Sequence, residues 1–212
     1  MSYWEKRDLN YQPQGLGQMT HTDLDFVMLD DFLDDPMAAR QQILDLDFQA
    51  PPNPEVGVIS FNGPIPDSLV EELDRKLSAH FSTPVEFHPR SKCALTFANV
   101  PKRNICHVDG GNNMCMFNWT VVVYLNTPEQ CQGGTNMYRH IPTGDIHNKR
   151  GHSFYAADYR DPAKWELVDQ AEMKFNRVLL CPAWRFHGLD FTFGDSKETA
   201  RMTLNPKVIV MS

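Results

Sequence analysis

The spacing of apolar residues changes near Pro84, and this change divides the chain into a helical and a strand-rich part. Before Pro84, an apolar residue recurs at every fourth position and predicts an amphipathic helix that begins at Pro66: Leu69, Leu73, Leu77 and Phe81. An earlier helix is predicted from Asp35-Pro36, because aspartate caps helix starts and proline is tolerated in the first turn. A short strand is expected just before it, within Asp23–Leu33. Residues 50–66 hold five prolines and are expected to be mostly loop.

After Pro84 the pattern is typical of strands and turns. The segments expected to form strands are Cys93–Asn99, Met114–Asn126, Thr135–Ile141, His152–Ala156, Arg177–Cys181 and Thr199–Ile209. Two helices followed by many strands indicate an α+β fold, with the helices on one side of an antiparallel sheet. So many short strands fit a sandwich or a jelly roll.

The length of 212 residues fits one domain. We expect an irregular arm over 1–22, a helical flank over 23–85 and a strand-rich core over 86–212.

Charge and composition narrow the function. A net charge of −7 argues against a general nucleic-acid binder, which needs clustered lysine and arginine. No apolar run is long enough for a membrane span, and the first residues lack the apolar centre of a secretory signal, so a cytoplasmic protein is expected. The five cysteines are an odd number without a Cys-x-x-Cys pair, which predicts reduced, packed thiols.

The segment Cys106-His107-Val108-Asp109-Gly110-Gly111 is the main candidate for chemistry. Side chains two positions apart in an extended chain point to the same side, so His107 and Asp109 can converge on one metal ion. A His-x-Asp pair alone is weak evidence for a metal site. His21-Thr22-Asp23 is a second copy of the pattern, which we interpret as a chance match.

Three further residues near the carboxyl end support a site. His187 follows the buried strand Asn176–Pro182, and two histidines with one carboxylate suit Fe(II) oxygen chemistry. The alternative for His187 is a loop histidine bound to backbone groups. Arg201 and Thr203 alternate with apolar residues and can share one face, where they can hold a carboxylate. The alternative for Arg201 is a surface ion pair.

The order of these motifs resembles the Fe(II)- and 2-oxoglutarate-dependent dioxygenases, and within them the prolyl-hydroxylase type. The resemblance covers residues 93–210 and rests on five features in sequence: His107-Val-Asp109, Tyr124-Leu-Asn126, Gly133-Gly134, Asn176-Arg-Val-Leu-Leu before His187, and Arg201. The opening strand and helix are also similar to that type's amino-terminal flank. The resemblance implies a double-stranded β-helix, that is, a jelly roll flanked by amino-terminal helices.

The resemblance also implies the site and the reaction. His107, Asp109 and His187 are the implied iron ligands, and Arg201 is the implied partner of the distal carboxylate of 2-oxoglutarate, assisted by Tyr124 and Thr203. With O2, such enzymes convert 2-oxoglutarate to succinate and CO2 while they hydroxylate an unactivated C–H bond. A small-molecule or peptide substrate, for example an amino acid, is expected.

Two departures stand out. Arg201 follows His187 by 14 residues, more than in the prolyl-hydroxylase type, so Phe191–Lys197 must form an extra turn. The stretch His140–Asp169 has no counterpart in that type.

The sequence does not decide between two other functions, and it does not define the substrate pocket. One alternative is a jelly-roll binding protein without catalytic activity. The other is a cupin-like enzyme that binds another metal through His140, His147 and His152. We interpret these three histidines as loop residues. The proposed pocket walls are Trp184, Arg185, Trp119, Asn118 and Arg139. The oligomeric state is open, and a homodimer is one of the options.

Overall fold

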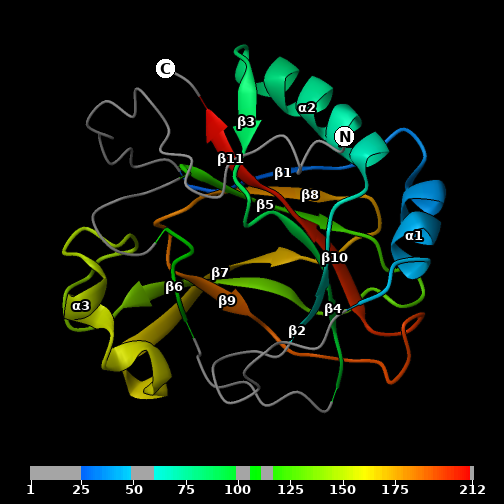
Figure 1. Ribbon diagram of the computed structural model, residues 1–212. Helices are drawn as coiled ribbons and strands as arrows, with labels where there is room; N and C mark the ends of the chain where they lie inside the picture. The colour runs from blue at the N-terminus through cyan, green and yellow to red at the C-terminus, as the bar shows by residue number, and fades with distance from the viewer. Residues whose placement is uncertain (1–24, 49–59, 99–105, 111–116, 211–212) are drawn as a thin grey trace.

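The computed structural model describes residues 25–48, 60–98, 106–110 and 117–210, which form two antiparallel sheets and few helices (Figure 1). The large sheet has eight strands in the order β1 (Val27–Leu29), β8 (Val178–Pro182), β5 (Trp119–Tyr124), β10 (Arg201–Asn205), β4 (Lys92–Thr96) and β2 (Ser60–Gly63), with β11 (Lys207–Val210) paired to β5 and to β3 (Val85–Phe87). The small sheet has the order β7 (Trp165–Glu172), β6 (Gly134–His140) and β9 (His187–Leu189). The predicted arm, with His21 and Asp23, and Cys115 lie outside the described residues.

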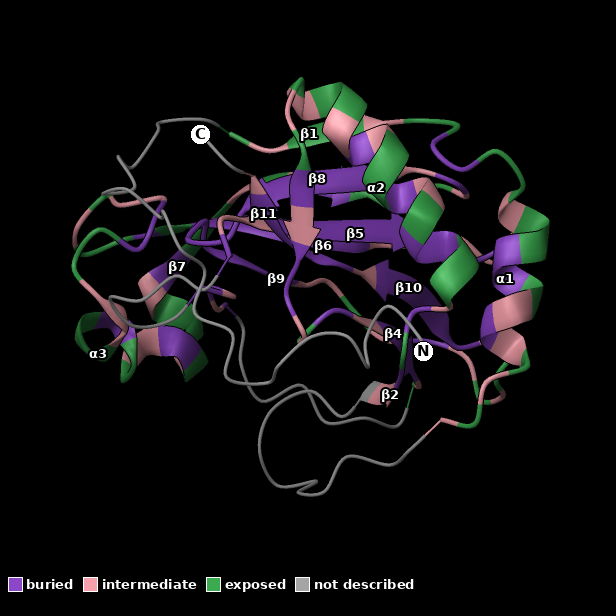
Figure 2. Cartoon of the chain, turned by 45° about the horizontal axis from the view of Figure 1, so that its top comes forward, coloured by how far each residue is buried: buried purple, intermediate pink, exposed green. Residues whose placement is uncertain are grey.

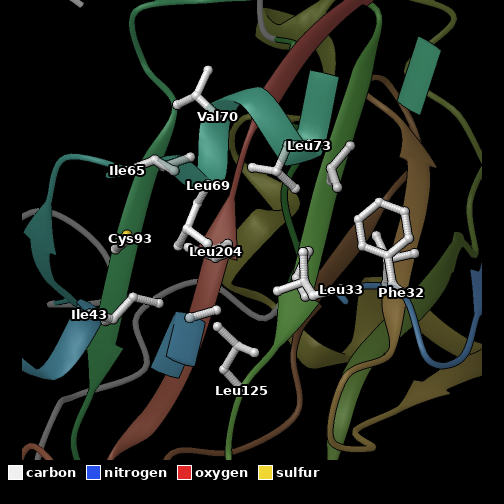
Figure 3. Packing of buried hydrophobic residues seen from close by; sticks show 14 of the residues in the cluster. Phe32, Leu33, Ile43, Ile65, Leu69, Val70, Leu73, Cys93, Leu125 and Leu204 are labelled. Atoms are coloured by element: carbon white, nitrogen blue, oxygen red, sulfur yellow. The ribbon is translucent and has the colours of Figure 1, made fainter. Parts of the chain in front are cut away.

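Two helices cover one face of the large sheet, as the apolar spacing predicts. Helix α1 (Pro36–Leu44) begins after Asp35, whose carboxylate accepts a hydrogen bond from the amide of Ala38. Helix α2 (Asp67–Phe81) buries its stripe, including Leu69 and Leu73, against the strands (Figure 3). Both predicted helices are therefore confirmed.

A buried arginine attaches α1 to the sheet. Arg40 is 5% exposed, and its guanidinium donates hydrogen bonds to the carbonyl oxygens of Leu125 and Glu198 at 2.9 and 2.5 Å. These carbonyls follow β5 and precede β10, so one side chain joins the helix to two neighbouring strand ends.

The central strands β8, β5 and β10 are buried on both faces (Figure 2), and the alternation of their side chains decides which of these face the small sheet. On β10, Met202 and Leu204 pack in the cluster under the helices, which leaves Arg201 and Thr203 on the opposite face. On β5, Tyr124 packs between the two sheets. We call the face of the large sheet that is turned toward the small sheet the inner face. The predicted shared face of Arg201 and Thr203 is confirmed.

The chain between β6 and β8 differs from the predicted pattern. His152–Ala156 was expected to be a strand, because Ser-Phe-Tyr has high strand propensity. It forms a helical turn, α3 (His152–Tyr155), because Tyr155 is buried against Phe186 and donates a hydrogen bond to Asp145 at 2.8 Å. The segment continues through two short 3-10 helices, η1 (Asp158–Arg160) and η2 (Pro162–Lys164).

Several strands were not expected from the sequence. Strand β7 exposes Glu166, Asp169 and Glu172, and it is a strand because β6 pairs along it. Strand β2 lies in the segment expected to be loop and pairs with β4. The predicted strand Thr199–Ile209 is split at Pro206 into β10 and β11. The amino-terminal flank therefore contributes β1 and β2 to the large sheet.

Helices of membrane-spanning length and apolarity do not occur in the described part of the chain.

Candidate metal centre

The structure brings His107, Asp109 and His187 together, with one ligand atom of each within 4.8 Å of the others. His107 Nε2 lies 3.6 Å from one carboxylate oxygen of Asp109, and His187 Nε2 lies 3.6 Å from the other. The two imidazole rings have their centroids 4.5 Å apart. Two imidazoles and one carboxylate around a common space are a donor set that suits Fe(II).

Backbone pairing holds the two histidines side by side. The amide of His107 donates to the carbonyl of His187 at 2.8 Å, and the amide of His187 donates back to His107 at 3.0 Å. The amide of Gly110 donates to the carbonyl of Ala183 at 2.8 Å. His187 was expected just past the end of a strand. It begins β9 instead, because it pairs with Met137 of β6 on one side and with His107 on the other.

The ring of His187 is oriented by a backbone group. Its Nδ1 lies 2.8 Å from the carbonyl oxygen of Arg185. A carbonyl only accepts hydrogen bonds, so Nδ1 carries the proton and Nε2 presents a lone pair toward Asp109. Such a hydrogen bond on the far nitrogen is the usual way in which proteins orient a metal-binding histidine.

Burial and the neighbouring polar groups shift the pKa of Asp109 in opposite directions. One of its oxygens accepts hydrogen bonds from Lys207 Nζ and, at 2.8 Å, from the hydroxyl of Thr120. Burial alone would raise the pKa of Asp109, but the positive charge of the adjacent Lys207 outweighs it. The pKa therefore lies well below its usual range, and the group is a carboxylate.

The sequence reasoning missed Lys207. The one signal is a lysine inside the apolar strand Pro206-Lys-Val-Ile-Val210, where it is 8% exposed. Buried lysines are rare without a partner, so such a residue marks a site of interest.

His107 is the most solvent-exposed ligand of the proposed metal centre. Its side chain is 40% exposed, against 8% for His187. Desolvation by the surrounding protein lowers the pKa of His107, and the neighbouring His187 lowers it further. Both effects favour the neutral imidazole, which is the form that binds a metal.

Arg201, Tyr124 and Thr203 lie together on the inner face. The guanidinium of Arg201 sits 5.6 Å from the ring centroid of Tyr124, and Thr203 is the register partner of Tyr124. The Tyr124 hydroxyl lies 2.8 Å from the hydroxyl of Thr135 on the small sheet. Arg201 is 7% exposed, its Nε has no hydrogen-bond partner, and no ion pair joins it to a carboxylate of the described residues. Burial lowers the pKa of Arg201, although an arginine keeps its charge.

The proposed pocket walls turn out to be mostly structural. Asn118 exchanges two hydrogen bonds with the backbone of Val210, and Trp119 packs against Phe81 of α2. Arg139 forms an exposed ion pair with Glu166. The buried guanidinium of Arg185 donates to three backbone carbonyls, those of Tyr138, Ile146 and Phe186.

The three histidines read as loop residues also belong to the framework. His140 ends β6, and its ring nitrogens lie 2.9 Å from Thr143 Oγ1 and 3.0 Å from Asp158 Oδ2. His147 is buried in a bridge with Arg185, and His152 begins α3.

Two cysteines near the centre are packed as expected. Cys106 and Cys181 are at most 1% exposed, and burial raises the pKa of both thiols. Neither is therefore a ready thiolate.

A family model describes residues 15–208 of this sequence under the name DUF6445, a family of unknown function. The chain belongs to the DUF6445 family. Among curated proteins, none matches the sequence.

Solved structures share the fold of this DUF6445 chain. The non-heme alpha ketoglutarate dependent carbocyclase SnoK from nogalamycin biosynthesis has a TM-score of 0.56 at 15% identity, over 88% of this chain and 79% of its own. An oxidoreductase of the 2OG-Fe(II) oxygenase family from Burkholderia pseudomallei has a TM-score of 0.52 at 14% identity, over 88% and 85%. These likenesses show a jelly-roll-like fold and, at such identities, the fold alone.

A prolyl hydroxylase from Trichoplax adhaerens, in complex with a peptide fragment of the hypoxia inducible factor oxygen degradation domain, matches at a TM-score of 0.49 and 15% identity, over 88% of this chain and 83% of that one. This likeness is too distant to assign a type within the fold.

Proposed function

We propose that this protein is an Fe(II)- and 2-oxoglutarate-dependent oxygenase that hydroxylates an unactivated C–H bond. The observation that carries the proposal is the convergence of His107, Asp109 and His187 beside an inner face on which Arg201 has no carboxylate partner among the described residues. A buried cation is unfavourable unless an anion neutralises it, and the distal carboxylate of 2-oxoglutarate is such an anion.

The side chains present fit these cofactors. His107, Asp109 and His187 would hold the iron, and Arg201 would hold the distal carboxylate. When bound, Fe(II) and 2-oxoglutarate supply, with O2, the oxidative decarboxylation that is coupled to substrate hydroxylation. The side chains of the protein would position the groups that bind these cofactors.

Three contacts would position the cofactor-binding groups. The Arg185 carbonyl accepts the Nδ1 proton of His187 in a hydrogen bond and so directs Nε2 at the site. Thr120 and Lys207 hold one oxygen of Asp109, which orients the carboxylate. Tyr124 places its ring face beside Arg201, and Thr203 offers a neighbouring hydroxyl on the same side of the sheet.

Finer features of the proposal follow from the sequence resemblance. We take the core to be a double-stranded β-helix of the prolyl-hydroxylase-like type, in one domain that includes the helical flank. The substrate is a small molecule or a peptide, with an amino acid as an example, and the location is cytoplasmic.

The test is an anaerobic titration of the purified protein with Fe(II) and saturating 2-oxoglutarate. A weak visible charge-transfer band is expected in the parent protein. His187→Ala removes a ligand and should abolish both the band and the binding of Mn(II) measured by calorimetry, with unchanged circular dichroism. His80→Ala is the matched control, because His80 is exposed on α2 and should leave both signals intact. No band in the folded, metal-loaded parent protein contradicts the proposal.

A further inference from the structure

The inner face carries two lysines beside the metal centre, in addition to Arg201. Lys207 is the register partner of Thr120 and contacts Asp109. Lys92 is the register partner of Asn205, and its neighbour in the strand, Cys93, packs under the helices, so Lys92 is turned to the inner face. Burial lowers the pKa of Lys92, the like charge of Lys207 lowers it further, and Asp109 opposes both. The residue before Lys92 also contacts Lys207 directly, because the hydroxyl of Ser91 accepts a hydrogen bond from the amide of Lys207 at 2.9 Å, so the two lysines are neighbours.

Positive charge exceeds negative charge around this centre. Asp109 is the carboxylate that meets Lys207, and among the described residues no hydrogen bond or ion pair joins Lys92 to an acidic side chain. Lys207 has three donor hydrogens and uses one on Asp109. Two lysines thus share this part of the inner face with Asp109, which meets Lys207, and a further anion would stabilise this arrangement.

These lysines are separate from the place proposed for the distal carboxylate of 2-oxoglutarate. Arg201 lies at the Tyr124 end of β5, whereas Lys207 lies opposite Thr120. Tyr124 lies four positions beyond Thr120 along β5, which is about 13 Å of strand. Lys207 is also held on Asp109, so we treat the two lysines as a cationic position distinct from Arg201.

We propose that the substrate carries an anionic oxygen group, a carboxylate or a phosphate, which Lys92 and Lys207 hold beside the metal centre. This inference rests on the oxygenase function proposed above and names the class of its substrate. Because Lys207 also touches Asp109, the reacting C–H bond lies only a few bonds away from the anionic group.

The test uses small anions on the loaded protein. Protein with ¹³C-labelled lysine is saturated with diamagnetic Zn(II) and 2-oxoglutarate, and is titrated with acetate, with methyl phosphate and with neutral acetamide. The Cε–Hε signals of Lys92 and Lys207 should shift to saturation with acetate or methyl phosphate and not with acetamide. The tighter of the two anions distinguishes a carboxylate from a phosphate.

Charge-removing variants complete the test. Lys92→Gln should weaken anion binding, read on the Lys207 signal, by about tenfold or more, the effect of losing a charge-assisted hydrogen bond. Lys174→Gln removes the same charge from an exposed ion pair with Asp30 and should change binding by less than about twofold. The affinity for 2-oxoglutarate should be the same in both variants.

Two results would contradict this inference but not the proposed function. The first is that the anions fail to bind although the visible band of Fe(II) and 2-oxoglutarate is present. The second is that Lys92→Gln lowers the affinity for 2-oxoglutarate and not the affinity for the anion. Absence of the band overturns the proposed function, and the inference with it.

Discussion

At the scale of single residues, the decisive groups are charged side chains that the fold places away from water. Arg201 is 7% exposed and its Nε has no hydrogen-bond partner, although the ring of Tyr124 lies beside it. An uncompensated buried charge lowers stability, so a folded protein keeps such a residue at the expense of its free energy of unfolding. Ligand binding is the simplest reason to retain it.

Arg201→Met should therefore separate stability from binding. The ligand-free variant should be as stable as the parent to within about 1 kcal/mol, or more stable, because an apolar chain replaces a buried cation. Its affinity for 2-oxoglutarate should fall by about tenfold or more, since charge-assisted hydrogen bonds to the carboxylate are lost. Urea unfolding and titration of the visible band measure the two effects. Arg139→Met, at an exposed ion pair with Glu166, is the control and should leave 2-oxoglutarate binding unchanged.

At the scale of elements, the small sheet determines where His187 lies. Strand β6 pairs with β7 on one side and with β9, which begins at His187, on the other. At the start of β6 the backbones approach closely, because a Cβ on Gly134 would lie 2.1 Å from the carbonyl oxygen of Ala171. Only glycine allows this pairing without displacement of β7 or β6.

Gly134→Ala should thus disturb both the sheet and the centre. We expect a loss of about 2–3 kcal/mol in the free energy of unfolding, from forced separation of the strands, and weaker Mn(II) binding because β9 shifts with β6. Denaturant unfolding and calorimetry provide the measurements. Gly144→Ala is a matched control in open space with a φ of +73°: it should destabilise by about 1–2 kcal/mol and leave metal affinity unchanged. Unchanged metal affinity in Gly134→Ala would show that β9 is held independently of β6.

At the scale of the whole molecule, early and late parts of the chain are joined by a charged contact. Asp30 follows β1, and its carboxylate accepts hydrogen bonds from Arg177 at 2.6 and 3.1 Å and from Lys174 at 2.8 Å, both just before β8. These hydrogen bonds lower the pKa of Asp30 below its usual range. The contact supports the pairing of β1 with β8 at the edge of the large sheet.

The pH dependence of this contact has a defined sign. The folded pKa of Asp30 is below that of the unfolded chain, about 3.9, so its stabilisation is complete above that pH and is lost as the pH falls through the lowered pKa. Asp30→Asn should therefore have a lower melting temperature than the parent at pH 7, and the difference should shrink below about pH 4. Added salt should also reduce this difference in melting temperature, because the carboxylate of Asp30 is partly exposed. A difference that persists at low pH would indicate that the charge is not responsible.

The whole molecule also determines the composition of the centre. Its ligands come from residues 107–109 and from β9, while Lys92 and Lys207 come from β4 and β11. Residues more than 100 positions apart thus share one small volume. Their combined charge, and not any single motif, is what favours an anionic substrate group.

The sequence by itself determined the features that depend on local periodicity. The two helices, the shared face of Arg201 and Thr203, and the His107-x-Asp109 spacing all follow from how side chains repeat along a helix or an extended chain. Short-range patterns did not predict α3 or β7, since burial of Tyr155 and pairing with β6 override local propensity there.

Only the tertiary structure decided the parts that depend on long-range pairing. The bridge between His107 and His187 makes the distal histidine part of a strand and sets the separation of the two rings. Sheet register brings Lys207 to Asp109 and turns Lys92 toward the same place. No sequence spacing encodes these contacts, because they arise where separate strands meet, and the electrostatics of the centre therefore exist only in the folded chain.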